Sequence, residues 1–218
     1  MKLSEHTLAI LKNFAGINSG VVLQEGNIQK TINHEQVILF EAQIQDSFPE
    51  KVGIYDLNQF LGNISTLNNP DLTFDTNMII LDDGEIKLNY HTCSPNLIKT
   101  PPEDKQLLMK DPDVSFNITA ASLQKLLKIA AMNSLPNISV IGLDGGLFFK
   151  THELKNDSSN YASIRIGDYD GKNFIASFKT EYLRVIPDDY EVEIKIDKFS
   201  RWVNKTGTLK YFIGMEKK

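Results

Sequence analysis

The histidines are the residues of this chain best suited to binding a metal, and their spacing argues against such a site. The four are scattered along the chain, at His6, His34, His91 and His152. No two lie four residues apart, and no cysteine pair accompanies them, as zinc sites require. The only cysteine, Cys93, excludes an internal disulfide. We therefore expect neither a metal site nor a cofactor.

Two glycine-containing segments resemble ligand-binding loops but lack the residues that would complete them. The run Gly-Leu-Asp-Gly-Gly from Gly142 has no Lys-Ser/Thr ending, so it is typical of a hairpin turn rather than a phosphate loop. The segment from Asp168 to Gly171 is like the start of a calcium loop, but Lys179 stands where the closing acid is required. Both segments are interpreted as turns. No pair of carboxylates or Ser–His arrangement is singled out either, which favours a binding or structural protein over an enzyme.

Lysines occupy the polar faces of two expected helices. Ser4 can cap a helix that begins at about Glu5, and Thr119 can cap a second one. The apolar spacing gives each helix one buried face, with Thr7, Ile10, Leu11 and Phe14 in the first and Leu123, Leu126, Leu127 and Ala130 in the second. Lys12, Lys125 and Lys128 then lie on the opposite faces. Taken alone, such faces indicate only contact with solvent.

A further helix is expected between these two, with a different polar face. Asp56 is a plausible N-cap with Gln59 three positions on. Its buried stripe is Leu57, Phe60, Leu61, Ile64 and Leu67. Its polar face offers Asn58, Gln59 and Asn63 but no lysine. The segments around it read as strands, with turns at Gly26-Asn27 and Asp83-Gly84.

A proline-dense stretch divides the chain. Residues 94–113 hold four of the eight prolines, and proline removes strand hydrogen-bond donors, so an extended linker is expected. We predict a first domain over residues 1–110, with its linker from about 94, and a second over 111–218. The alternative is a long surface loop within one domain. The helix-then-strands order recurs after the linker as a weak internal repeat, with Thr180–Ile186 as a short counterpart of the second helix. This order predicts α+β architecture with antiparallel sheet.

The charge balance conflicts with simple adhesion to nucleic acid. The 218-residue chain has a net charge of −5 and a pI of about 5.4, whereas domains that grip DNA are usually basic. The N-terminus lacks a signal-peptide pattern. No run approaches ~18 uninterrupted apolar residues, so no membrane span is expected. A cytosolic protein is therefore predicted.

The sequence resembles the sliding clamps of T-even-type phages from end to end. The opening MKLSEHTLAILKNFAGINSGVVL and the segment IYDLNQFLGNIS from Ile54 carry the most specific similarity. The segments ITAASLQKLL and GDYDGKNF, the Pro187-x-x-Tyr190 pair and the final aromatic strand ending Met215-Glu216 follow in the same order. The middle strands and the linker differ strongly from the family.

The resemblance implies a DNA polymerase processivity factor without chemistry of its own. It implies two similar processivity-fold domains, a homotrimeric ring with helices lining a hole and antiparallel sheets outside, and duplex DNA bound without sequence specificity. It further implies a DNA polymerase and a clamp loader as partners, in the cytoplasm of an infected host cell. A ring also resolves the charge conflict, because encirclement supplies residence on DNA without strong phosphate affinity.

Two sets of site residues follow from the resemblance. The DNA-facing set is Lys2, Lys12, Lys125 and Lys128. The partner-peptide pocket, near the linker, would comprise Leu107, Leu108, Met109, Ile186, Pro187 and Met215; ordinary core closure under the linker is the alternative for each of these. The competing function is a small cytosolic α+β enzyme whose site is invisible in the sequence. A ligand-bound metal, or a cleft with strongly shifted titrating groups, would favour it.

Overall fold

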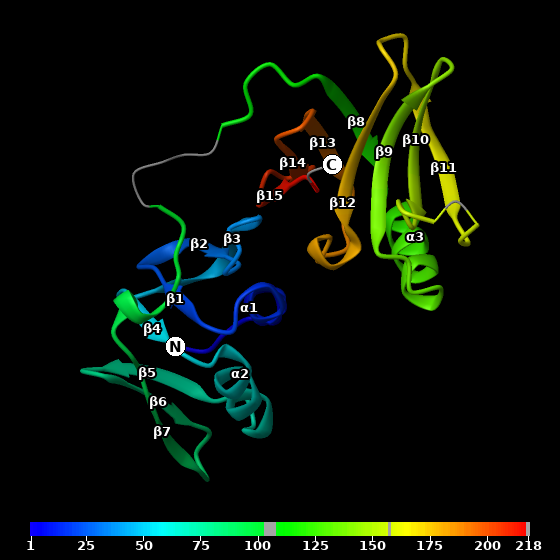
Figure 1. The fold of residues 1–218 in the computed structure, drawn as a ribbon. Coiled ribbons are helices and arrows are strands. Elements are labelled where there is room, and N and C mark those ends of the chain that lie inside the picture. Colours follow the sequence, from blue (N-terminus) through cyan, green and yellow to red (C-terminus); the bar gives the residue numbers. More distant parts are fainter. Residues whose placement is uncertain (103–107, 157, 217–218) are drawn as a thin grey trace. The chain divides into compact units, whose positions relative to one another are not determined.

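The computed structural model describes residues 1–102, 108–156 and 158–216. The chain forms two compact units, Met1–Lys105 and Gln106–Lys218, and both combine α-helix with antiparallel strands (Figure 1). The predicted α+β class is confirmed. Among the described residues, no helix is long and apolar enough to cross a membrane.

The described residues of the first unit form two helices and three groups of paired strands. In chain order the elements are α1 (Glu5–Ile17), β1 (Val21–Leu23), β2 (Gly26–Ile32), β3 (Ile38–Phe48), β4 (Val52–Ile54), α2 (Leu57–Thr66), β5 (Asp71–Asp75), β6 (Met78–Asp82), β7 (Lys87–His91) and the 3-10 turn η1 (Pro95–Leu97). Strand β1 pairs with β4, β2 pairs with β3, and β5, β6 and β7 form a three-stranded sheet, all antiparallel. The predicted turn at Gly26-Asn27 is wrong, because these residues begin β2.

Both helices of the first unit begin at the predicted caps. The Ser4 hydroxyl accepts from the Thr7 N–H at 3.2 Å, and the Asp56 carboxylate accepts from the Gln59 N–H at 2.9 Å. These bonds satisfy N–H groups that have no partner inside a helix. The buried residues of α1 include the four predicted ones, and Phe14 meets Phe40 of β3 edge-on at 5.0 Å. The predicted stripe of α2 is also buried.

The start of the predicted linker is attached to the first unit. Ile98 is buried, and the buried Asn18 side chain donates to the Lys99 carbonyl at 3.2 Å. Cys93 forms an isolated bridge with Gly53, where the Cys93 N–H donates to the Gly53 carbonyl at 2.9 Å. The chain therefore stays bound to the first unit up to about residue 99, beyond the predicted linker start.

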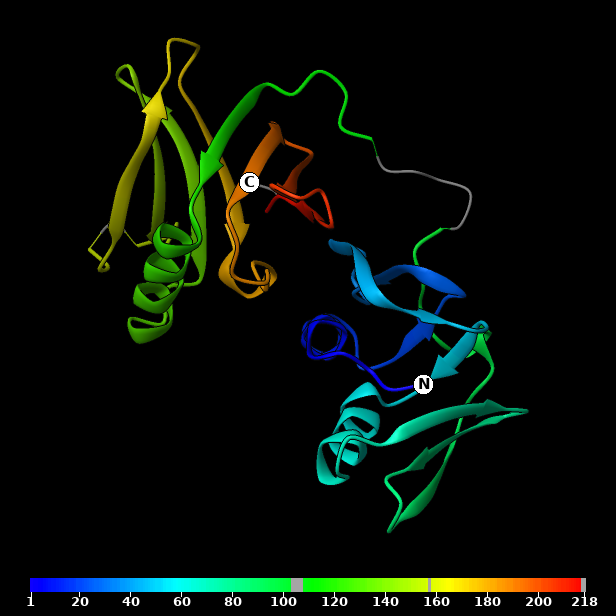
Figure 2. The same cartoon turned by 180° about the vertical axis from the view of Figure 1, so that it is seen from behind.

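The described residues of the second unit form one long helix and two groups of paired strands. Its elements are β8 (Val114–Ile118), α3 (Ala120–Met132), β9 (Asn137–Leu143), β10 (Gly146–His152), β11 (Ala162–Asp168), β12 (Phe174–Lys179), the 3-10 turn η2 (Thr180–Tyr182), β13 (Tyr190–Lys195), β14 (Phe199–Asn204) and β15 (Leu209–Gly214). One sheet has the order β11-β10-β9-β12. In the other, β8, β13, β14 and β15 pair in that order. Helix α3 packs on β10 and β11 (Figure 1 and Figure 2).

The core of the second unit is built around one aromatic cluster. Trp202 is fully buried, with Phe149 at 6.2 Å and Tyr190 at 6.1 Å between ring centroids. The predicted buried face of α3 holds for Leu123, Leu126 and Ala130, whereas Leu127 is only half-buried. The predicted counterpart of the second helix shrinks to the single turn η2, since its apolar residues form no helical stripe.

Candidate functional site

The lysines predicted to face DNA lie on exposed helix faces. Lys12 is exposed on α1, on the side away from the buried stripe that packs on β3. Lys125 and Lys128 are exposed on α3 and stand one helical turn apart. Flexible ammonium groups on rigid helices can contact phosphates without reading bases. These faces are suited to a sequence-independent polyanion contact.

Lys2 and helix α2 contribute less positive charge to the predicted DNA-facing surface than the lysines of α1 and α3. The Lys2 ammonium lies 3.9 Å from the Asp71 carboxylate, and both side chains are largely exposed. Helix α2 presents Asn58 and Gln59 to solvent and half-exposes Asn63, as its sequence predicts. Positive charge on the helices is therefore concentrated on α1 and α3.

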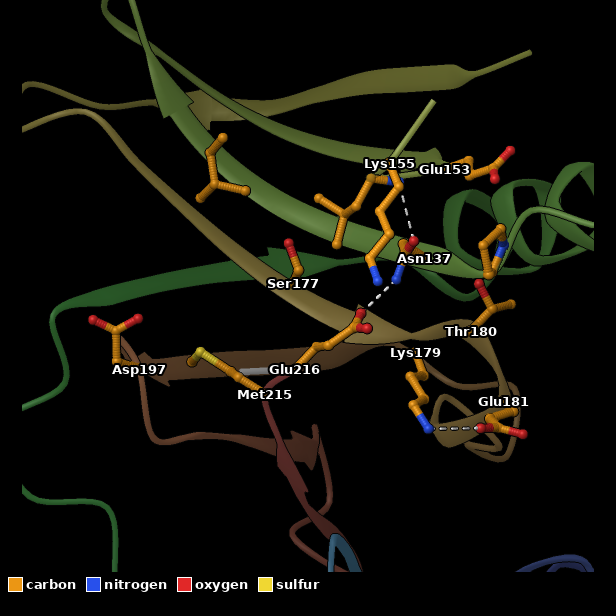
Figure 3. A pocket seen from close by; sticks show the side chains of 13 residues that line it. Asn137, Glu153, Lys155, Ser177, Lys179, Thr180, Glu181, Asp197, Met215 and Glu216 are labelled. Atoms are coloured by element: carbon orange, nitrogen blue, oxygen red, sulfur yellow. Dashed lines mark hydrogen bonds and ion pairs between the residues drawn. The ribbon is translucent and has the colours of Figure 1, made fainter. Parts of the chain in front are cut away.

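A cavity of about 870 Å³ lies within the second unit, against β12 and the residues that follow β15 (Figure 3). Of the predicted pocket residues, Met215 lines it. The other lining residues are Pro136, Asn137, Glu153, Leu154, Lys155, Ile175, Ser177, Lys179, Thr180, Glu181, Asp197 and Glu216. Its wall combines exposed apolar side chains, Ile175 and Leu154, with charged groups. Such a mixture suits a peptide with both apolar and polar anchors.

The residues after β15 are held in this cavity by backbone and side-chain bonds. The Glu216 N–H donates to the Ser177 carbonyl at 2.8 Å. The Glu216 carboxylate accepts from the Asn137 amide at 2.5 Å (Figure 3). Asn137 is 5% exposed and also accepts from the Leu154 N–H at 3.1 Å. One buried amide thus joins three distant segments at the cavity wall.

A buried polar chain lies behind the cavity. The Ser139 hydroxyl is 2.8 Å from both His152 Nε2 and the Ser177 hydroxyl. Burial, together with the nearby Lys150 charge, lowers the pKa of His152, which favours its neutral form. Ser139 is fully buried, so its pairing with His152 satisfies polar groups inside the unit.

The remaining predicted pocket residues do not line this cavity. The half-buried Ile186 uses its N–H to donate to the Tyr211 hydroxyl at 3.0 Å, and Pro187 beside it is exposed. Leu108 is 61% exposed and Met109 is half-buried, while Leu107 lies outside the described residues. The cavity therefore brings Met215 together with residues the sequence did not indicate, such as Asn137 and Ser177.

The segment after β11 is a turn, as predicted, and it has a packing role. It crosses the end of the β9–β10 hairpin, where the Tyr169 N–H donates to the Gly145 carbonyl at 3.2 Å. The Tyr169 ring lies against Gly142 and meets Phe174 at 5.2 Å. Asp168 pairs with Arg165 at 2.7 Å. In the described part of the chain no three His, Cys, Asp or Glu side chains group as metal ligands.

Comparisons with known proteins agree on one family. A sequence model of the DNA polymerase processivity factor family matches residues 2–81. The chain is 30% identical over 221 residues to the sliding clamp of Vibrio phage KVP40, covering 99% of each. It is also 30% identical to the sliding clamps of Escherichia phage RB69 and Enterobacteria phage T4, over 88% of this chain and 86% of each relative.

Solved structures show the same fold at low identity. Proliferating cellular nuclear antigen (PCNA) from Entamoeba histolytica superposes with a TM-score of 0.69 at 12% identity, covering 97% of this chain and 95% of that one. PCNA of A. fulgidus, bound to the C-terminal region of FEN-1, gives 0.69 at 10% identity with the same coverage. The 30% identity to phage sliding clamps, rather than this likeness of fold, favours a processivity factor over the alternative of a small enzyme.

Proposed function

The chain belongs to the sliding clamp family of DNA polymerase processivity factors, and from that premise we propose that three copies close head-to-tail into a ring threaded by duplex DNA. The ring is loaded by a clamp loader and tethers the replicative DNA polymerase, in the cytoplasm of an infected host cell. The protein performs no catalysis in this role. The observation that carries the proposal is the end-to-end similarity to phage sliding clamps.

In the proposed ring, Lys12, Lys125 and Lys128 face the phosphates, with Lys2 as a weaker contributor. The support for Lys12, Lys125 and Lys128 is the exposed position of each on a helix whose other face is buried. Because the whole chain is anionic at −5, adhesion alone cannot hold it on DNA at physiological salt. Encirclement removes that requirement, and a few mobile lysines keep the contact weak enough for sliding.

The proposed partner-binding site is the cavity that Met215 lines. Its volume and mixed lining suit a short peptide, and the similar PCNA of A. fulgidus is bound to the C-terminal region of a partner protein. The predicted neighbours Leu107, Leu108, Met109, Ile186 and Pro187 remain candidates for a second part of the same contact. A polymerase and a clamp loader would then compete for one site.

Retention on circular DNA tests the ring directly. The protein is loaded onto a nicked plasmid by its clamp loader, and bound protein is separated by gel filtration in high salt. Protein held by encirclement stays on the circle, because salt weakens only the phosphate contacts, and it is released when one restriction cut linearises the DNA. Release from the intact circle at the same rate as from the linear form would refute the proposal.

A further inference from the structure

Strand β12 has a free edge that faces the cavity. In the sheet order β11-β10-β9-β12, β9 is the one strand beside β12 among the described residues. In an antiparallel pair the N–H and C=O groups of alternate residues point toward the partner strand or away from it. The Ser177 carbonyl points away from β9, since it accepts from the Glu216 N–H. By the same alternation, the N–H and C=O of Ile175 point away from β9.

The residues after β15 already use part of this edge. Glu216 makes one strand-like bond to Ser177, and Asn137 holds its side chain in place. In the described part of the chain no other strand pairs with the Ile175 end of the edge. The Ile175 side chain is 42% exposed, and Leu154 in the same cavity is 39% exposed. An unpaired edge beside exposed apolar side chains is the arrangement that accepts an added strand.

The charge of the cavity indicates what kind of strand fits. Its carboxylates, from Glu153, Glu181, Asp197 and Glu216, outnumber its two lysines, Lys155 and Lys179. Lys179 is further offset by Glu181, 3.4 Å away. In Figure 3, Asp197 and Glu216 lie on either side of Met215. A peptide strand here would therefore place an apolar side chain against Ile175 and Met215, and a lysine or arginine against this acidic pair.

We propose that an extended peptide of the DNA polymerase binds by adding a strand to the free edge of β12 at Ile175, beside the bond that Glu216 makes to Ser177. This rests on the proposed function, because it assumes that the cavity receives the polymerase. It assigns the affinity to backbone hydrogen bonds at Ile175 and the selectivity to alternate side chains, one apolar and one basic.

Amide hydrogen exchange measured by NMR locates the added strand. Overlapping peptides that tile the polymerase encoded with this clamp are titrated into the full chain, and the tightest is kept as the probe. Exchange of the Ile175 amide should slow at least about tenfold on saturation, because that N–H gains a partner. The Ala176 amide points to β9 and serves as the internal control, with little change. A bound peptide that leaves Ile175 exchange unaltered overturns the proposal.

Two substitutions at one position separate backbone from side chain. Ile175→Pro removes an N–H that no strand among the described residues uses, and it should weaken peptide binding about tenfold or more. Ile175→Ala keeps the N–H and should weaken it by a smaller factor. Equal loss in both variants, with melting temperatures unchanged, overturns the strand-addition mode. If Ile175→Pro does not fold, the exchange measurement on the unmodified chain decides whether the peptide adds a strand at Ile175.

The clamp function and this binding mode can fail separately. If the chain supports processive synthesis but the peptide protects amides elsewhere, only the β12 site is wrong. If no ring is retained on circular DNA, the proposed function itself is refuted, whatever the exchange data show.

Discussion

Lys12, Lys125 and Lys128 share one environment, an exposed position on a helix whose opposite face is in the core. A long flexible cation in that position adds little to folding stability, because exposed charges interact weakly across water. Its removal therefore tests function with little disturbance of structure.

Replacing Lys12, Lys125 and Lys128 together by glutamate should leave the melting temperature nearly unchanged and strongly reduce DNA-bound processivity. Reversed charge repels the phosphates both during loading and during sliding. Primer extension on long single-stranded templates at moderate salt measures the processivity. The matched control replaces the exposed Lys110, Lys172 and Lys198 by glutamate, which changes net charge equally. Equal processivity in the two triple variants would remove the hole-facing role of α1 and α3.

Asp46 of β3 ties down the start of α1. Both the N–H and the hydroxyl of Ser4 donate to its carboxylate at 2.8 Å. Burial of the Asp46 carboxyl acts to raise its pKa, but hydrogen bonds from Thr7 and Ser4 and the charge of His6 outweigh burial, so the pKa lies below its ordinary value. A carboxylate with a lowered pKa in the folded state stabilises the fold above its unfolded pKa of about 4. That stabilisation is lost as pH falls through the folded pKa.

Asp46→Asn should lower the free energy of unfolding at pH 7 by about 1–2 kcal/mol, the usual range for charge-assisted bonds at a helix start. Its loss of stability on acidification below about pH 4 should be shallower than that of the unchanged chain. Urea denaturation at several pH values gives both quantities. Asp170→Asn, in an exposed turn, is the control and should track the unchanged chain. A parallel pH dependence for Asp46→Asn and wild type contradicts the assignment.

The connection between β11 and β12 depends on a glycine in a neighbouring strand. A Cβ on Gly142 of β9 would lie 2.5 Å from the Phe174 ring and 2.6 Å from the Tyr169 ring. Gly142 therefore allows Tyr169 to pack where the connection crosses the hairpin end. This gives a structural reason for the GDYDGKNF segment that also marks the resemblance to phage clamps.

Gly142→Ala should destabilise the second unit by about 1–3 kcal/mol, the usual cost of overpacking. Gly167→Ala is the matched control, since a Cβ there meets nothing within 4 Å, and it should change stability by less than about 0.5 kcal/mol. Thermal denaturation by circular dichroism compares them. Equal melting temperatures for the two variants would show that Tyr169 moves aside freely.

The helices were predictable because their signals are local. The caps Ser4, Asp56 and Thr119 and the apolar spacing that follows each one define the helix start and its buried face within about a dozen residues. Strand partners are not local. Strand β1 pairs with β4 rather than with β2, and no sequence pattern distinguishes these alternatives.

The cavity could not be predicted for the same reason. Asn137 and Glu216 are 79 positions apart, and each is an unremarkable polar residue in its own segment. Only Met215 was anticipated, through the resemblance. A signal was present in the alternation of Ile175, Ser177 and Lys179 along one strand face, but the edge position of β12 requires the sheet order.

The proposed ring also has a simple signature as a particle. Native mass spectrometry or sedimentation equilibrium should give three times the 24.6 kDa chain mass. The trimer fraction should fall on dilution, because assembly depends on concentration. A single species at the chain mass at all concentrations tested would contradict the assembly.

Cys93 has a practical consequence that follows from its half-buried position beside Gly53. Burial raises the pKa of its thiol, so the reactive thiolate is scarce at neutral pH and maleimide dyes should modify it slowly. A cysteine placed at the exposed Lys172 would then be labelled in strong preference to the native one. One fluorophore per subunit would let a microscope follow individual clamps diffusing on a stretched DNA molecule.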